Sequence, residues 1–164
     1  MYKKKAEELF DYTVNIRRSM HENPELSSLE DQTVKLVEDE LEKIGIDYVE
    51  IENGGILGFI EGNKESDNPK TIIIRADLDA LPFIEPDKNL KNERLVKSKN
   101  FGVMHACGHD GHTSMALTSA RILYENRDDF AGRVIFCFER GEETGANYKY
   151  LMAYLGKNEI DIDT

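Results

Sequence analysis

The sequence lacks several features that would place it outside the soluble globular proteins. It has no apolar run of about 20 residues, the length that a membrane-spanning helix needs. Its first residues, Met-Tyr-Lys-Lys-Lys-Ala-Glu-Glu, lack the apolar segment of a secretion signal. Of its 2 cysteines, Cys107 lies in a polar cluster and Cys137 in an apolar run, and a disulfide between them is the weaker interpretation in a reducing compartment. These absences predict a soluble, cytoplasmic protein.

Basic residues are also fewer than acidic ones. The chain has 21 lysines and arginines against 32 aspartates and glutamates, which gives a formal net charge of -11. Such a charge disfavours nucleic acids and anionic membrane surfaces as partners. Hydrophobic residues make up 40% and charged residues 32%, as in a globular protein. The 164 residues suffice for one domain.

The spacing of apolar residues predicts a series of helices and strands joined by polar loops at 62–70 and 85–101. Helices are expected over 3–20, from a capping box at Ser27 and Glu30 to Gly45, over 114–124, and over 145–155 before Gly156. Strands are expected at 46–51 and 56–60 as a hairpin-like pair, at 71–74 with both faces covered, and at 133–138. Residues 159–164 are expected to be the start of a further strand.

The nine residues 104–112, Met-His-Ala-Cys-Gly-His-Asp-Gly-His, contain one thiol, three imidazoles and one carboxylate. Cys107 and His109 can reach one cation, since Gly108 between them has no Cβ to hinder the approach. Asp110 can hold an imidazole by its other nitrogen. The cluster precedes a predicted helix, whose macrodipole favours a thiolate and a carboxylate. A metal site is therefore indicated, and an ordinary helix N-terminus with a buried cysteine is the alternative.

An acidic pair, Glu142 and Glu143, follows the predicted strand at 133–138. Such a pair supplies an oxygen ligand and a base for metal-activated water. A structural metal site would be closed by four ligands and would give Glu142 no purpose. A redox pair of Cys107 with Cys137 would leave the acidic pair unexplained.

Two more places carry polar side chains with open interpretations. Asp77 and Asp79 follow the predicted strand at 71–74, so they are candidates for a site at the carboxyl end of the sheet, or for a turn with local hydrogen bonds. His21 ends the first predicted helix, and we expect it to interact with the last carbonyl groups of that helix.

Four motifs then occur in one order along the chain. They are Arg-Arg-Ser-Met-His-Glu-Asn-Pro-Glu-Leu-Ser at 17–27, Arg-Ala-Asp-Leu-Asp-Ala-Leu-Pro at 75–82, the cluster at 104–112, and Phe-Glu-Arg-Gly-Glu-Glu-Thr-Gly-Ala at 138–146. Together they resemble the amidohydrolase branch of the aminoacylase and carboxypeptidase metallopeptidase family, which includes hippurate hydrolase and the indole-acetyl-amino-acid hydrolases. Four motifs across nearly the whole chain make the resemblance specific.

The resemblance implies an α/β catalytic domain with three layers, α/β/α, and a mixed sheet. It also implies two divalent metal ions, zinc or manganese, and hydrolysis of the amide bond in N-acyl amino acids or short peptides. By position in the motifs, Cys107, His109 and Glu143 would bind metal, and Glu142 would be the general base that deprotonates a metal-activated water. Two acidic positions, Asp79 and Asp110, would have supporting roles.

The chain departs from the family pattern in two ways. Family members commonly carry Gln-Pro-Ala where this chain has Glu-Arg-Gly at 139–141. They are also much longer, and beyond the end of this chain they supply two further histidine ligands and a lid domain used in substrate binding and dimerisation. We therefore expect residues 1–164 to be the N-terminal part of a truncated catalytic domain, without the lid. For His105 and His112 we expect local hydrogen bonding. An inactive fragment that binds metal partially is the alternative function.

Overall fold

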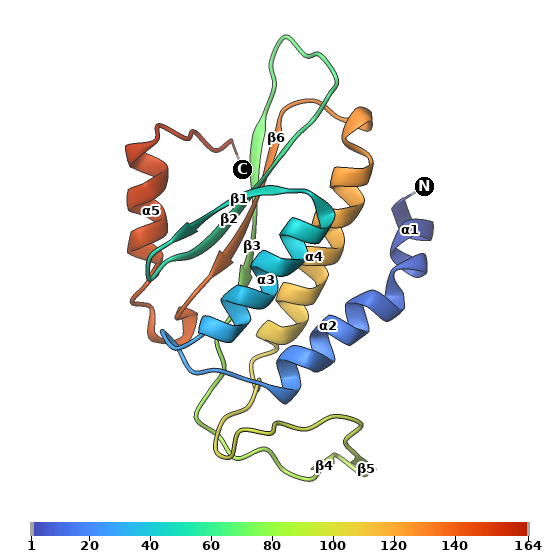
Figure 1. Ribbon diagram of the computed structural model, residues 1–164, viewed down its shortest axis with the longest axis vertical. Coiled ribbons are helices and arrows are strands. Elements are labelled where there is room, and N and C mark those ends of the chain that lie inside the picture. Colours follow the sequence, from blue (N-terminus) through green and yellow to red (C-terminus); the bar gives the residue numbers. More distant parts are fainter. Residues whose placement is uncertain (1, 164) are drawn as a thin grey trace.

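A four-stranded sheet runs through the centre of the computed structural model, which describes residues 2–163 (Figure 1). Its strands lie in the order β1-β2-β6-β3. β3 pairs parallel with β6, and the other neighbours pair antiparallel, so the predicted mixed sheet is confirmed. The strands are β1 (Asp47–Ile51), β2 (Gly55–Glu61), β3 (Thr71–Asp77) and β6 (Arg133–Glu139).

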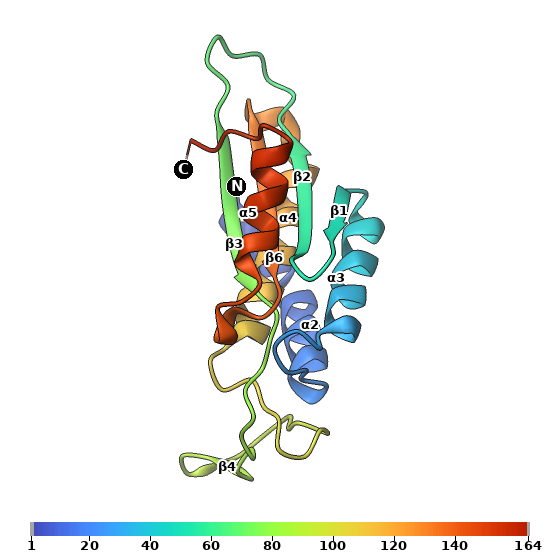
Figure 2. The same ribbon diagram turned by 90° about the vertical axis from the view of Figure 1, so that its left-hand side faces the viewer.

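Helices cover both faces of this sheet (Figure 2). α2, α3 and α4 pack on one face and α5 on the other, which confirms the predicted three-layer α/β/α arrangement. None of the helices in residues 2–163 is long and apolar enough to cross a membrane. The helices are α1 (Tyr2–Glu8), α2 (Phe10–Glu22), α3 (Asp31–Ile44), α4 (His109–Glu125) and α5 (Tyr148–Lys157).

Alternate residues of β6 supply the two apolar layers. Phe136 and Phe138 are fully buried on the side of α2, α3 and α4, while Ile135 and Cys137 pack toward Leu151 of α5. A strand buried on both faces has no solvated side, which is why its sequence is an unbroken apolar run rather than an alternating one. Because β6 is packed on both faces, it fixes the position at which the acidic segment that follows it begins.

The N-terminal half differs from the expected pattern at its helix starts. The first predicted helix is two helices, α1 and α2, and the second begins at Asp31 without a side-chain cap from Ser27. Glu25 accepts hydrogen bonds from the backbone N–H groups of Gln32 and Thr33 instead, at 3.2 and 2.7 Å. Gly45 ends α3 in the left-handed conformation, as expected.

β3 is an edge strand in the part of the chain that the structure describes. The expectation that both its faces are covered is wrong, since Ile72 is 38% exposed. No regular strand forms over 159–163, although the backbone N–H of Asp163 donates to the Thr71 carbonyl at 2.8 Å. Thr164, the last residue of that expected strand, lies outside the described residues.

A long excursion connects β3 to α4. It extends beyond the sheet at the bottom of Figure 1 and carries only a minimal hairpin, β4 (Lys88–Asn89) and β5 (Asn92–Glu93), so most of it is loop as predicted. The excursion returns to the sheet through an isolated bridge between Leu81 and Met104. This bridge places the Cys/His cluster directly beyond the end of β3.

Candidate metal centre

The predicted site residues converge at one end of the sheet. Because β3 and β6 are parallel and in register, with Asp77 opposite Glu139, both strands deliver their C-terminal segments to the same edge. Asp79 follows β3 by two residues, and a short 3-10 turn over Glu142–Thr144 follows β6. α4 begins at the same edge with His109. Three separate segments of the chain therefore meet there.

Cys107, His109 and Glu143 lie together. Each offers one ligand atom, and these atoms all lie within 4.8 Å of one another. His109 is buried, while Cys107 and Glu143 are open to solvent, so the group is anchored by the histidine and accessible from outside. Cys107 and Cys137 are both free thiols. The structure therefore brings the three predicted ligands within reach of one cation.

The ring of His109 is oriented by Asp79. Its Nδ1 lies 2.9 Å from the backbone carbonyl oxygen of Asp79 and 3.0 Å from its Oδ1. Both atoms are acceptors, so Nδ1 carries the proton and the neutral ring keeps its lone pair on Nε2. Orientation of a ligating imidazole by a second group of this kind is the usual arrangement at metal sites.

The Nε2 atom of His109 faces carboxylates without bonding to them. It lies 3.7 Å from Glu142 Oε2, 3.8 Å from Glu143 Oε1 and 3.9 Å from Asp77 Oδ2, and it makes no hydrogen bond to any residue in 2–163. Ligand atoms at the corners of a tetrahedron with metal bonds of 2.0–2.3 Å are separated by about 3.3–3.8 Å. The spacing and chemistry of these donors therefore fit a divalent cation between them.

Asp79 also connects the turn over Glu142–Thr144 to the rest of the site by hydrogen bonds. Its Oδ2 accepts hydrogen bonds from the Ser27 hydroxyl at 2.6 Å and from the backbone N–H of Glu143 at 2.9 Å. Burial raises the pKa of Asp79, but the hydrogen bonds from His109, Ser27 and Glu143 outweigh it and lower the pKa below its ordinary value. Asp79 is thus a buried carboxylate kept ionised by its donors.

Glu142 projects from the turn toward the same point. Its carboxylate joins Asp79 and His109 in a second group of potential ligands, and its Oε1 lies 3.9 Å from the Arg75 guanidinium. The turn begins at Gly141 with a φ of 65°, where a Cβ would lie 2.6 Å from the Asn147 side-chain nitrogen. Glycine at 141 is therefore required both by the backbone conformation and by space.

Asp77 and His112 join the site, although the sequence pattern did not distinguish Asp77 from a turn residue. With His109 they form a third group whose ligand atoms lie within 4.8 Å. His112 Nδ1 lies 3.3 Å from Asp77 Oδ2, so His112 makes a hydrogen bond, although its partner lies 35 positions away in the sequence. The expectation of local hydrogen bonding is wrong for His105, because both its ring nitrogens are buried without a hydrogen-bond partner in residues 2–163. Asp77 could have been recognised as a site residue from the sequence, because it lies two residues before Asp79.

Asp110 points away from these groups, toward α2. Its Oδ2 lies 2.7 Å from His21 Nδ1 and 2.8 Å from Arg17 Nε. The other ring nitrogen of His21 lies 2.8 Å from Glu85. The expected contact of His21 with helix carbonyls is therefore wrong, because the imidazole joins two buried carboxylates. The hydrogen bond to Asp110 raises the pKa of His21, with burial opposing it.

Comparisons with known proteins identify the family of this chain. Residues 73–164 match the family described as peptidase family M20/M25/M40. The chain belongs to this family. The "IAA-amino acid hydrolase ILR1-like 5" of Arabidopsis thaliana is 42% identical over 149 residues, covering 90% of this chain and 32% of that protein. The "N-acyl-L-amino acid amidohydrolase" of Geobacillus stearothermophilus is 39% identical over 128 residues, covering 77% of this chain and 32% of that protein. The predicted family is thus confirmed.

A solved member of the M20 family has the same fold. The YXEP protein of Bacillus subtilis, described as a dinuclear metal binding peptidase, superposes with a TM-score of 0.80 and 33% identity, covering 91% of this chain and 41% of that one. The chain spans about a third of the length of the curated relatives that it matches. The fold described above is accordingly part of an M20 peptidase domain.

Proposed function

We propose that this chain provides part of the active site of a metal-dependent hydrolase that cleaves the amide bond of N-acyl amino acids or short peptides. The observation that carries the proposal is the Nε2 atom of His109, which lies 3.7–3.9 Å from three carboxylates and makes no hydrogen bond to any residue in 2–163. The names of the relatives, an IAA-amino acid hydrolase and an N-acyl-L-amino acid amidohydrolase, support this substrate class.

Cys107, His109 and Glu143 would hold a divalent ion, zinc or manganese, through the thiolate, Nε2 and the carboxylate. A divalent ion held there supplies Lewis acidity, which lowers the pKa of a water molecule and polarises the amide carbonyl. Three protein ligands leave a position open, as hydrolytic sites require. The ligands of the second expected ion then come in part from residues outside this sequence, and residues 1–164 are the N-terminal portion of the catalytic domain.

Glu142 is the proposed general base. Its carboxylate lies beside the cluster and is 36% exposed, so it is accessible to water and to substrate. It would accept a proton from the attacking water and pass that proton to the leaving amine. Asp79 would keep the His109 ring in the tautomer that leaves Nε2 free, and Asp110 is proposed to support the site from the other side of α4.

Metal content tests the ligands separately from catalysis. The purified chain is loaded with zinc or manganese, desalted and measured by mass spectrometry. Cys107→Ser and Glu143→Gln should retain at least about tenfold less metal than the unchanged chain. Glu65→Gln, at an exposed loop position, is the matched control and should retain it all. Equal retention in all four proteins would overturn the ligand assignment.

Turnover of N-acetyl and N-benzoyl amino acids by the same samples tests the base. Glu142→Gln should keep its metal and lose activity by a factor of about 100 or more. Undiminished activity in Glu142→Gln would exclude it as the base. Metal retention by the unchanged chain without any turnover would favour the alternative, a metal-binding portion whose catalysis requires residues outside this sequence.

A further inference from the structure

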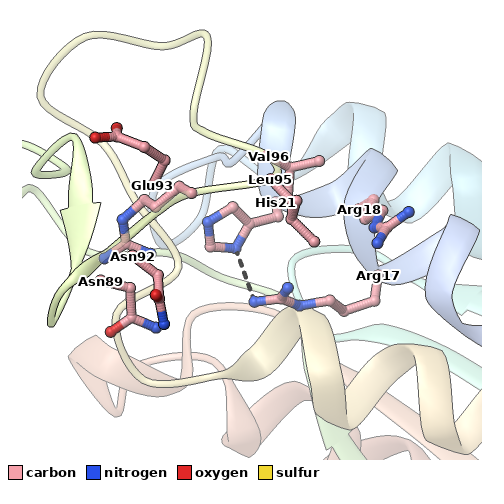
Figure 3. Close-up of a pocket in the computed structure, with 9 residues that line it drawn as sticks. Arg17, Arg18, His21, Asn89, Asn92, Glu93, Leu95 and Val96 are labelled. Carbon is pink, nitrogen blue, oxygen red and sulfur yellow. Dashed lines mark hydrogen bonds between the residues drawn. The ribbon is translucent and has the colours of Figure 1, made fainter.

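A cavity of about 310 Å³ opens between α2 and the β4–β5 excursion (Figure 3). Its volume suits a small molecule or ion rather than a macromolecule. His21, which pairs with the buried Asp110, belongs to the lining, whereas no member of the three candidate ligand groups around His109 does. The polar and charged lining consists of Arg17, Arg18, His21, Asn89, Asn92, Glu93 and Arg94.

The acidic groups beside this cavity already have cationic partners. Asp110 pairs with Arg17 at 2.8 Å, and Glu85 pairs with Arg94 at 3.0 Å. His21 contacts both buried carboxylates as well. Glu93, the one carboxylate among the lining residues, pairs with Lys88 at 3.3 Å. Arg18 forms no ion pair with any residue of 2–163, so the positive charge around the cavity is in excess.

The guanidinium groups also have donors to spare. Each offers five N–H bonds. Arg94 uses Nε for the Pro86 carbonyl at 2.9 Å and Nη1 for Glu85, which leaves Nη2. Arg17 uses Nε for Asp110, and its Nη2 lies only loosely, at 3.4 Å, beside His21. Figure 3 shows Arg17 and Arg18 on the α2 side of the cavity and the amides of the excursion across from them.

We propose that this cavity binds a small oxyanion, a carboxylate or phosphate, between Arg17, Arg18 and Arg94. Guanidinium groups match the paired oxygens of both anions, and charge-assisted hydrogen bonds are stronger than neutral ones. The side-chain amides of Asn89 and Asn92 supply further donors from the opposite wall. The site is separate from the metal cluster and does not depend on the proposed hydrolysis. The whole chain has a net charge of -11, so the excess of positive charge around this cavity is a local feature.

Titration of the chain with inorganic phosphate and with acetate, followed by ¹⁵N NMR, tests the site. At constant ionic strength, we expect the arginine Nε–H signals of Arg17 and Arg94 and the amide signals of Asn89 and Asn92 to shift together and to saturate. The anion that saturates at the lower concentration identifies the class of ligand. Absence of saturable shifts with both anions would overturn the proposal.

Arg18→Ala gives the matched test by mutation. Arg18 is exposed and has no ion-pair partner within residues 2–163, so its loss should leave the fold intact. It should weaken binding of the preferred anion about tenfold. Arg121→Ala removes the same charge from α4, where Arg121 pairs with Glu125, and should leave binding unchanged. Equal weakening by both substitutions would show only a general charge effect and would contradict a specific binding site at this cavity. Circular dichroism and metal content confirm that each variant keeps its fold and cluster.

Discussion

Glu30 accepts a hydrogen bond from the backbone N–H of Gly141 at 2.7 Å, although 110 residues separate the two along the chain. The carboxylate of Glu30 is fully buried, and its other oxygen lies 3.0 Å from Arg140 Nε. Gly141 opens the turn that carries Glu142 and Glu143. The start of α3 therefore fixes the position of the acidic pair.

Glu30→Gln tests this connection. A buried ion pair that loses one partner leaves the other charge uncompensated, so we expect the free energy of unfolding to fall by about 3 kcal/mol. Because the turn is then held less firmly, zinc affinity measured by calorimetry should also fall. Asp31→Asn is the control, since Asp31 also pairs with Arg140 but its side chain is 80% exposed. It should cost about 0.5 kcal/mol or less in urea denaturation and leave zinc affinity unchanged. Equal effects of the two substitutions would refute the anchoring role of Glu30.

Local motifs allowed the sequence to predict where Cys107, His109 and Glu143 would lie. Cys107 and His109 are two residues apart at a helix N-terminus, and Glu143 follows a strand whose apolar run is unmistakable. In each of these cases the information lies within about ten residues. Parallel strands then bring their C-terminal ends to one edge, so a rule about sheets was enough to join the segments.

Residues whose roles depend on distant partners were not predictable. Glu30 has the spacing of a capping box with Ser27, but its carboxylate is used by Arg140 and Gly141. His21 looked like a helix-terminal residue because nothing near it in sequence reveals Asp110 or Glu85. Local patterns cannot tell a cap from a long-range anchor, since both need the same polar side chain beside a helix end.

The two cysteines should differ sharply in reactivity. Burial raises the pKa of Cys137 to about 12, so it has almost no thiolate at neutral pH. Cys107 is exposed. At about pH 8, iodoacetamide should alkylate Cys107 at least about tenfold faster than Cys137, as followed by peptide mass spectrometry. Added zinc should slow labelling of Cys107 because the thiolate becomes a ligand, and Cys137→Ser should show the same protection. Labelling of Cys107 at the same rate with and without zinc would argue against its coordination.

Gly55 should tolerate no side chain. Its φ is +118°, and a Cβ there would lie 2.0 Å from the Phe138 backbone oxygen, within the pairing of β2 with β6. Gly55→Ala should therefore lower the free energy of unfolding by roughly 3 kcal/mol or more. Gly156→Ala is the contrasting change, since a Cβ there meets nothing within 4 Å and the residue lies in α5. Alanine at 156 should stabilise the protein by about 0.5–1 kcal/mol. Thermal and urea denaturation of both variants would show whether the space around each glycine, rather than the mere loss of a glycine, decides the change in stability.

His105 should make the metal-free protein less stable in acid. Burial lowers the pKa of its imidazole to about 4, whereas the unfolded chain has the ordinary value of 6.5. Between these values the unfolded state binds more protons, so stability is lost as the pH falls from 6.5 toward 4. The total loss should be roughly 3 kcal/mol.

Substitution of His105 separates this titration from other acid effects. His105→Phe and His105→Gln both remove the titrating ring, so each should flatten the decline in the free energy of unfolding by the same roughly 3 kcal/mol across that pH range, measured with a chelator present. The two variants should differ in absolute stability. Glutamine would be a buried polar group without a hydrogen-bond partner, as His105 is, whereas phenylalanine has no polar group to satisfy. A pH dependence identical to that of the unchanged chain in both variants would mean that the folded protein accommodates the imidazolium, against the burial that the structure shows.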